Sequence, residues 1–101
     1  MKSKLYYEAH VTIEPVFDER LEDLKKIAFY WGFRVADLLM VKRPNDTPER
    51  SKYDTFMTAR NTDYDIIHDN TIRCVDNLFE AGFKVWRYKI EDTLLDVRLV
   101  N

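Results

Sequence analysis

The chain has 101 residues, of which 16 are Lys or Arg and 18 are Asp or Glu, so its formal net charge is −2. This length is enough for one domain with its own core, and the pI of about 5.7 disfavours binding to duplex nucleic acid, which depends on neutralising phosphates. No apolar run approaches the ~18 residues that cross a membrane, and the single cysteine forms no internal disulfide. We therefore expect a cytoplasmic protein that binds neither a membrane nor duplex nucleic acid.

The first predicted element is a strand over residues 5–14. Residues 8–14 read Glu-Ala-His-Val-Thr-Ile-Glu, and this alternation is typical of a strand with one buried face. Ala9, Val11 and Ile13 are predicted to point toward the core. The opposite face carries the side chains that look suited to chemistry: Glu8, His10, Thr12 and Glu14.

The chain contains an internal repeat. Gly-Phe-Arg-Val at residues 32–35 recurs as Gly-Phe-Lys-Val at residues 82–85, and each copy follows apolar residues at helical spacing. Gly32 and Gly82 stand where a helix ends in the left-handed conformation, and the phenylalanine after each is expected to fold back on the last turn. The repeat divides the chain into similar halves, residues 5–43 and 53–91.

The other strands are predicted over residues 34–42, 53–60 and 84–91. Residues 43–52 contain two prolines and mostly polar side chains, which predicts a mobile surface loop. Two βαβ units joined in this way interleave most simply as a ferredoxin-like α+β sandwich. It has a four-stranded antiparallel sheet in the order 4-1-3-2, with both helices on one face. Because many functions share this fold, the function must be sought on the other face, which we term the open face.

Alternation of side chains predicts which residues reach the open face. In the last strand, the expected core set is Trp86, Tyr88 and Ile90. The set predicted for the open face is Glu8, His10, Thr12, Glu14, Phe56, Thr58, Arg60, Val85, Arg87, Lys89 and Glu91.

The chemistry that these residues suit is the handling of anions. Arginine and lysine neutralise phosphate or carboxylate, and threonine adds a neutral donor. Histidine can act as a general acid or base, and Glu8 or Glu91 would supply a second proton carrier. The predicted catalytic residues are His10 and Glu8. The predicted binding residues are Thr12, Arg87, Lys89, Thr58, Arg60 and Glu91.

His10-Val11-Thr12 on a central strand resembles the His-x-Thr motif of the two-histidine (RNA-ligase-like) phosphoesterases. In that superfamily two pseudo-symmetric lobes each supply one motif, one histidine acting as base and the other as acid while the threonines hold the phosphate. This chain has one such motif, since the second half carries Thr-Ala-Arg at 58–60 or Arg-Tyr-Lys at 87–89 instead. The resemblance therefore implies either a site completed by two chains, each giving one His10, or a domain that binds phosphoesters without cleaving them.

Other interpretations of the open face stay open. Alternating charges can be solvated cross-strand ion pairs, or the face can bind another protein or a second copy in a homodimer. Binding of single-stranded RNA would need exposed aromatic residues, for which alternation offers Phe56 and Tyr6. No cofactor is expected. No metal is expected either, because the neighbours predicted for Glu8, His10 and Glu14 are cations.

Overall fold

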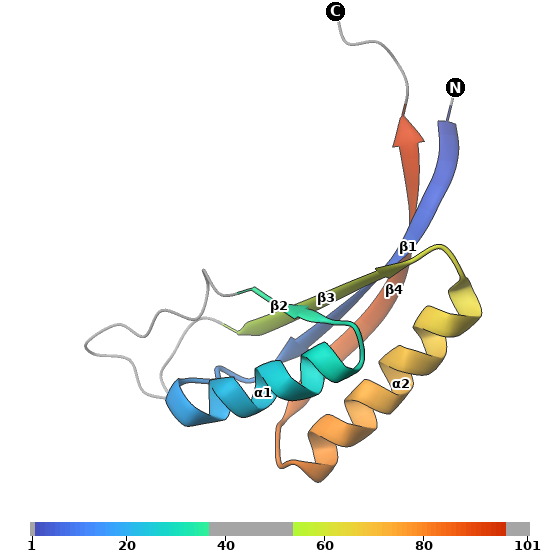
Figure 1. Ribbon diagram of the computed structural model, residues 1–101. Coiled ribbons are helices and arrows are strands. Elements are labelled where there is room, and N and C mark those ends of the chain that lie inside the picture. The colour runs from blue at the N-terminus through green and yellow to red at the C-terminus, as the bar shows by residue number, and fades with distance from the viewer. Residues whose placement is uncertain (1, 37–53, 97–101) are drawn as a thin grey trace, which may run out of the picture.

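The computed structural model describes residues 2–36 and 54–96. The elements in chain order are β1 (Lys2–Ile13), α1 (Asp18–Tyr30), β2 (Arg34–Val35), β3 (Thr55–Asn61), α2 (Tyr64–Glu80) and β4 (Val85–Asp96). The strands pair antiparallel in the order β2-β3-β1-β4, which is the predicted order counted from the other edge. Both helices cover one face of this sheet (Figure 1). The predicted ferredoxin-like α+β fold is confirmed.

β1 and β4 are longer than predicted. Lys2 pairs with Asp96, so the two strands continue as a ribbon beyond the end of β3 (Figure 1). The sequence lacks clear alternation in these extensions, and their strand structure depends on pairing with each other. β2 is described only as Arg34–Val35; most of the predicted strand 34–42 and the predicted loop 43–52 lie outside the described residues.

β1 lies at the centre of the sheet and its apolar side chains begin the core. Ala9, Val11 and Ile13 are all 0% exposed, as the alternation predicts. Full burial of a side chain the size of valine or isoleucine contributes ~1.5–3 kcal/mol. The helix residues that pack into the same core are Leu24, Ala28, Ile67, Cys74, Val75 and Leu78.

Both helices end in the way that the repeat predicts. Gly32 and Gly82 have φ angles of +82° and +88°, which a side chain would strain. The N–H of Phe33 donates to the carbonyl of Ala28 at 2.7 Å, and the N–H of Phe83 makes the equivalent bond at the end of α2. Both phenylalanine side chains are buried. These are Schellman endings, and each turns the chain directly toward the next strand.

Glu14 joins the corner where β1, α1 and β4 meet. Its carboxylate accepts the N–H of Lys84 at 2.9 Å and a guanidinium N–H of Arg20 at 3.2 Å. Arg20 also donates to the carbonyl of Gly82 at 3.2 Å. The prediction that Glu14 belongs to the open face is therefore wrong, because β1 ends at Ile13 and the next residue no longer follows the alternation.

We expect Glu14→Gln to lower the free energy of unfolding by about 1 kcal/mol, because the two donors lose a charged acceptor. Urea denaturation would show a lower midpoint at an unchanged slope. Glu22→Gln is the matched control: Glu22 is exposed and pairs with Lys25 at 3.8 Å, so its loss should stay within about 0.5 kcal/mol. Equal losses in the two variants would contradict the structural role of Glu14.

Candidate functional site

The strand register gathers the predicted site residues into three cross-strand rows on the open face. The first row consists of Arg34, Thr58, His10 and Lys89. The second consists of Phe56, Thr12 and Arg87, and the third of Arg60, Glu8 and Glu91. Neighbours in a row lie ~5 Å apart. Every residue predicted for catalysis or binding therefore lies in one cluster, although its role stays a prediction.

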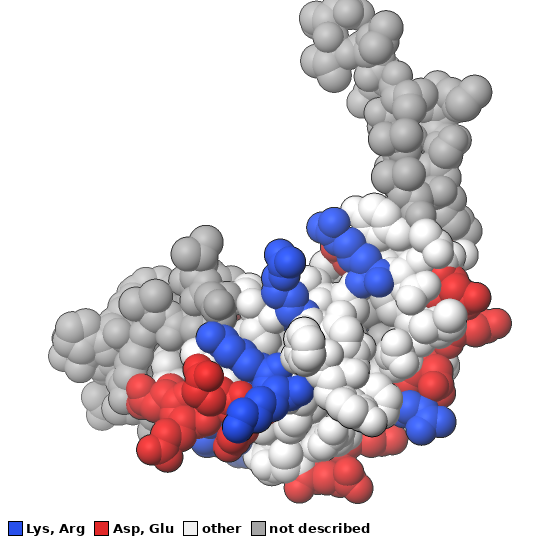
Figure 2. Space-filling view, viewed as in Figure 1, with Lys and Arg blue, Asp and Glu red and all other residues white. Residues whose placement is uncertain are grey.

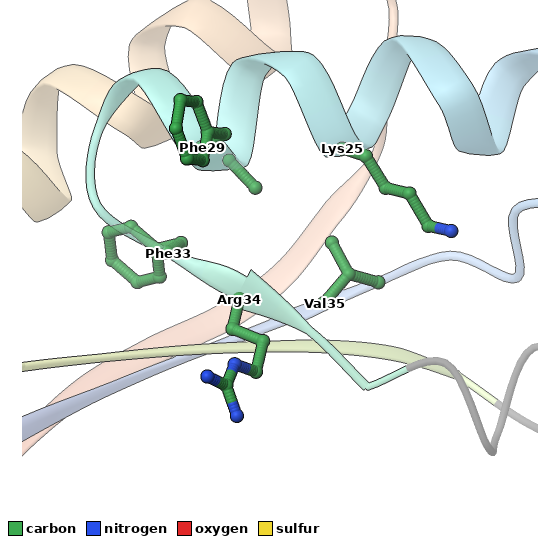
Figure 3. Close-up of a pocket in the computed structure, with 6 residues that line it drawn as sticks. Lys25, Phe29, Phe33, Arg34 and Val35 are labelled. Carbon is green, nitrogen blue, oxygen red and sulfur yellow. The ribbon is translucent and has the colours of Figure 1, made fainter.

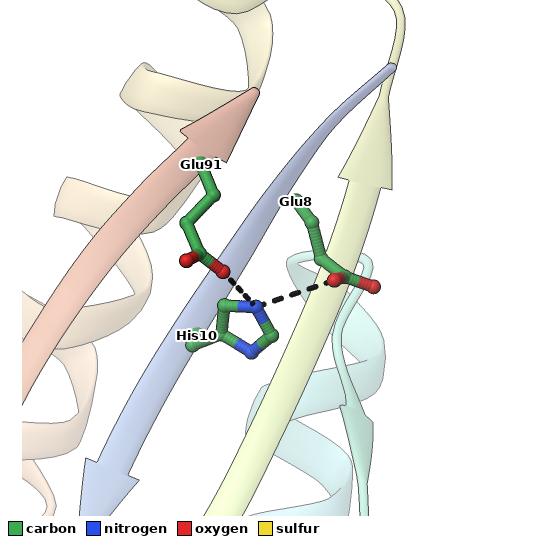
Figure 4. Close-up of side chains that lie close together, drawn as sticks. All are labelled: Glu8, His10 and Glu91. Atoms are coloured by element: carbon green, nitrogen blue, oxygen red, sulfur yellow. Dashed lines mark ion pairs between the residues drawn. The ribbon is translucent and has the colours of Figure 1, made fainter. Parts of the chain in front are cut away.

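His10 lies between two carboxylates. Its Nε2 is 3.3 Å from Oε1 of Glu8 and 3.0 Å from Oε1 of Glu91, which reaches it from β4 (Figure 4). A hydrogen on Nε2 is thus directed at the carboxylates, while Nδ1 points away from both (Figure 4). In a neutral imidazole of this tautomer, Nδ1 carries the lone pair. Carboxylates that fix the tautomer in this way leave the other nitrogen able to act as a general base.

The remaining carboxylate oxygens are bound by cations. Oε2 of Glu8 accepts from Nε of Arg60 at 3.0 Å, and Oε2 of Glu91 is 3.3 Å from Nζ of Lys89. These side chains are partly exposed, and ion pairs of this kind contribute ~0–1 kcal/mol. Arg60 and Lys89 are therefore already partly neutralised, but a ligand can compete for them at small cost.

Arg87 is placed differently. It is exposed and, within residues 2–36 and 54–96, makes no ion pair. It borders a hollow of about 210 Å³, which we term the Arg87 hollow. The hollow is lined by His10, Thr12, Phe56, Arg87, Lys89 and Glu91. Thr12 is only 8% exposed. This hollow combines a guanidinium that forms no ion pair with another described residue, a hydroxyl, an imidazole, an aromatic ring, an ammonium group and a carboxylate.

A β-bulge changes which side chains of β4 reach the open face. The register shifts by one residue between Thr12 and Ile13, so Val85 packs against the core. Trp86 is 53% exposed, and its Nε1 donates across β1 to Oδ1 of Asp54 at 3.1 Å. The predicted core position of Trp86 and open position of Val85 are therefore wrong. Assigning alternate residues of a strand to opposite faces assumes that its pairing with the neighbouring strand is uninterrupted. One extra residue exchanges the two faces for all residues beyond it.

Tyr88 faces the helix-covered side of the sheet, as the alternation predicts, but it is not buried. It pairs with Val11, which faces the helices, yet it is 47% exposed. Ile90, two residues on, packs partly against the core. β4 is an edge strand, so a side chain on it has a neighbouring strand on one side only.

A second hollow of about 260 Å³ lies at the β2 edge, and we term it the Arg34 hollow. Its lining residues are Gly32, Arg34, Thr58, Ala59 and Arg60. Figure 3 shows Arg34 pointing away from α1. Its guanidinium pairs with no acid in the part of the chain that the structure describes. Arg34 is not among the residues predicted for the site, although alternation from Val35, which is buried beside it, would place Arg34 on the open face.

Another pocket lies between α1 and β2, and Figure 3 shows it. It has about 310 Å³ and is lined by Lys25, Ala28, Phe29, Phe33, Arg34 and Val35. It is larger than the Arg87 hollow, but its lining has no carboxylate or imidazole. It is therefore a poorer candidate for acid–base chemistry.

Metal chemistry has a geometric basis but unfavourable surroundings. One ligand atom each from Glu8, His10 and Glu91 lies within 4.8 Å of the others, and these are atom types that Zn²⁺ accepts. Arg60 and Lys89 bind the same two carboxylates. Their positive charges would repel a divalent ion, so the surroundings disfavour a metal at this position.

Thiol chemistry is disfavoured by the position of Cys74. The side chain is fully buried in the core stripe of α2. Burial raises the pKa of the Cys74 thiol to about 12. It therefore stays protonated at neutral pH and is neither a nucleophile nor a metal ligand.

No model of a known protein family and no curated protein matches the chain. The resemblance to the two-histidine phosphoesterases therefore remains a prediction that rests on His10-Val11-Thr12. Among the described residues, neither helix has the length and apolar character needed to cross a membrane. The function has to be argued from the geometry of the open face.

Proposed function

We propose that the open face binds a phosphoester or nucleotide-like anion in the Arg87 hollow. The observation that carries this proposal is Arg87 itself, an exposed guanidinium that has no ion-pair partner among the described residues and borders a concave surface. A guanidinium matches the geometry of phosphate with two parallel hydrogen bonds. Thr12 and Lys89 line the same hollow and add a hydroxyl and a second positive charge.

Phe56 favours a nucleotide over inorganic phosphate. Its ring lines the Arg87 hollow, in the same row as Thr12 and Arg87. An aromatic face beside an anion-binding group suits a base or a sugar, because stacking is tolerant of the ring's identity. The ligand class that fits all these groups is a phosphate ester with a ring attached.

We further propose that His10 acts as the acid–base group on that ester. Glu8 and Glu91 orient its ring from one side, which leaves Nδ1 available for a proton transfer. Cleavage needs a second proton carrier. Either Glu91 or the His10 of a second copy meets that need, in keeping with the single His-x-Thr motif.

We expect Arg87→Gln to weaken the binding of uridine monophosphate about tenfold, because one lost charge-assisted contact costs ~1.5 kcal/mol. Isothermal titration calorimetry at low ionic strength measures this. Arg73→Gln is the control, since Arg73 lies on α2 and pairs with Asp69 at 2.8 Å. An equal loss in both variants would indicate a general effect of charge, and an absence of binding to the wild type would overturn the proposal.

We expect His10→Ala to abolish hydrolysis of a cyclic or linear nucleotide phosphodiester while changing ligand affinity by less than about threefold. Phosphorus NMR of the products measures turnover, and circular dichroism checks the fold. Absence of turnover by the wild type would remove the catalytic part of the proposal and leave the binding part in place.

Pairing of two copies through the open face is the second candidate function. The observation that favours it is Trp86, a large aromatic side chain that is 53% exposed on this face. Tryptophan and arginine are enriched at the centres of interfaces. A pair of chains arranged in this way would also bring two His10 side chains to one site.

If two copies pair through this face, sedimentation velocity will show a dimer that Arg87→Glu dissociates, because the reversal turns a positive charge of the paired face into a negative one and removes its charge complementarity. Glu80→Lys on the exposed end of α2 is the matched control and should leave the dimer intact. A wild-type monomer at all accessible concentrations would exclude this function.

A further inference from the structure

We infer that the ligand is a single strand of nucleic acid that crosses the open face from β4 to β2. This inference rests on the proposed function and specifies its ligand. Arg87 and Arg34 are the two arginines of the open face for which the described parts of the chain provide no ion pair. They stand on opposite edge strands, three strand spacings or ~14 Å apart. The two arginines border different hollows, an arrangement that suits a chain of phosphates better than a single phosphate group.

Each arginine borders its own hollow, and polar side chains connect the two. The Arg87 hollow has about 210 Å³ and the Arg34 hollow about 260 Å³. His10 lines the first, Thr58 lines the second, and the two residues are direct partners across β1 and β3. A ligand lying across the sheet would therefore meet hydrogen-bonding groups along its whole path.

Aromatic side chains lie beside this path on two strands. Phe56 of β3 lines the Arg87 hollow, and the bulge in β4 brings Trp86 to the same face. Aromatic rings on an open sheet are platforms for unpaired bases, and they are of no use to a duplex, whose bases already stack on each other.

The acidic pI arises mainly from the other side of the molecule. The two helices carry eight Asp or Glu and four Lys or Arg. Figure 2 shows acidic side chains gathered over the N-terminal end of α1 and along α2. The three rows of the open face instead carry four Lys or Arg against two Glu. A polyanion is therefore repelled by the helix layer and attracted to the open face. The net negative charge of the chain is thus compatible with binding of a nucleic-acid strand on the open face.

The test compares fluorescein-labelled hexauridylate, followed by fluorescence anisotropy, with uridine monophosphate as competitor. We expect the hexamer to bind at least about tenfold more tightly, because its second contact becomes intramolecular. The affinity of the hexamer should also fall more steeply with salt. The slope of the logarithm of the association constant against the logarithm of the salt concentration should become more negative by about 0.7 for each additional phosphate contacted. A hairpin whose stem holds six G·C pairs, and which therefore stays double-stranded during the titration, should bind more weakly than the single strand. Hexadeoxyuridylate tests the contribution of the 2′-hydroxyl, and tight binding of either single strand supports the inference.

Three variants assign the contacts, each checked for folding by urea denaturation. Arg34→Gln should lower hexamer affinity about fivefold and reduce its salt slope by about 0.7, with monophosphate affinity unchanged within about twofold. Arg87→Gln should weaken both ligands. Lys26→Gln, on the exposed surface of α1, should weaken neither.

The failure of this inference differs from the failure of the proposed function. A hexamer that binds no more tightly than the monophosphate, a hairpin that binds as well as the single strand, or an Arg34→Gln variant without effect overturns the inference. In each of those cases, a monophosphate affinity that still depends on Arg87 leaves the proposed function standing. Binding of neither ligand overturns both.

Discussion

The central position of β1 is the constraint on which the rest of the structure depends. This strand is hydrogen-bonded to β3 on one side and to β4 on the other, so its backbone is satisfied within the sheet. Ala9, Val11 and Ile13 are completely buried beneath the helices. A shift by one residue would place these apolar side chains in solvent and bury Glu8 and His10. The register that protects the core is therefore the same register that assembles the rows of the open face.

The C-terminal end of β1 combines a β-bulge with a set of charge-assisted hydrogen bonds. At its C-terminal end the bulge opposite Ile13 turns Val85 inward and Trp86 outward. Just beyond, Glu14 fixes the chain to Lys84 and α1 through charge-assisted hydrogen bonds. The bulge thus adds an aromatic surface to the open face without a loss of core packing, since Val85 takes the inward position. Bulges often redirect side chains next to functional sites in this way.

The Lys and Arg side chains of the open face fall into two groups, those that pair with Glu8 or Glu91 and those that do not pair within the described residues. Each exposed ion pair around His10 contributes little to stability, on the order of 0–1 kcal/mol. Its main effect is positional, because Glu8 and Glu91 fix the imidazole and hold Arg60 and Lys89 close to it. Arg87 and Arg34 stand outside this network in the described chain. Within residues 2–36 and 54–96, these two positive charges have no carboxylate partner to give up before they bind an anion.

Much of the fold could be predicted because it depends on local patterns. The alternation at residues 8–14 indicates a half-buried strand, and the two Gly-Phe motifs indicate helix endings that the φ angles of Gly32 and Gly82 confirm. The cluster around His10 could also be predicted, since alternation and strand order together determine which side chains share a face.

The sequence by itself therefore determined the order of the elements, the fold class and the membership of most of the open face. Tertiary structure alone decided three features: the position of Trp86, the groups that Glu14 binds, and which Lys and Arg side chains of the open face form ion pairs. A bulge has no local signature in this chain, because the extra residue is defined by its partner strand and not by its own neighbours. Likewise, Arg60 reaches its carboxylate partner, Glu8, only when β3 pairs with β1. Local periodicity specifies the face of a strand, whereas long-range contacts specify which groups on that face remain available to a ligand.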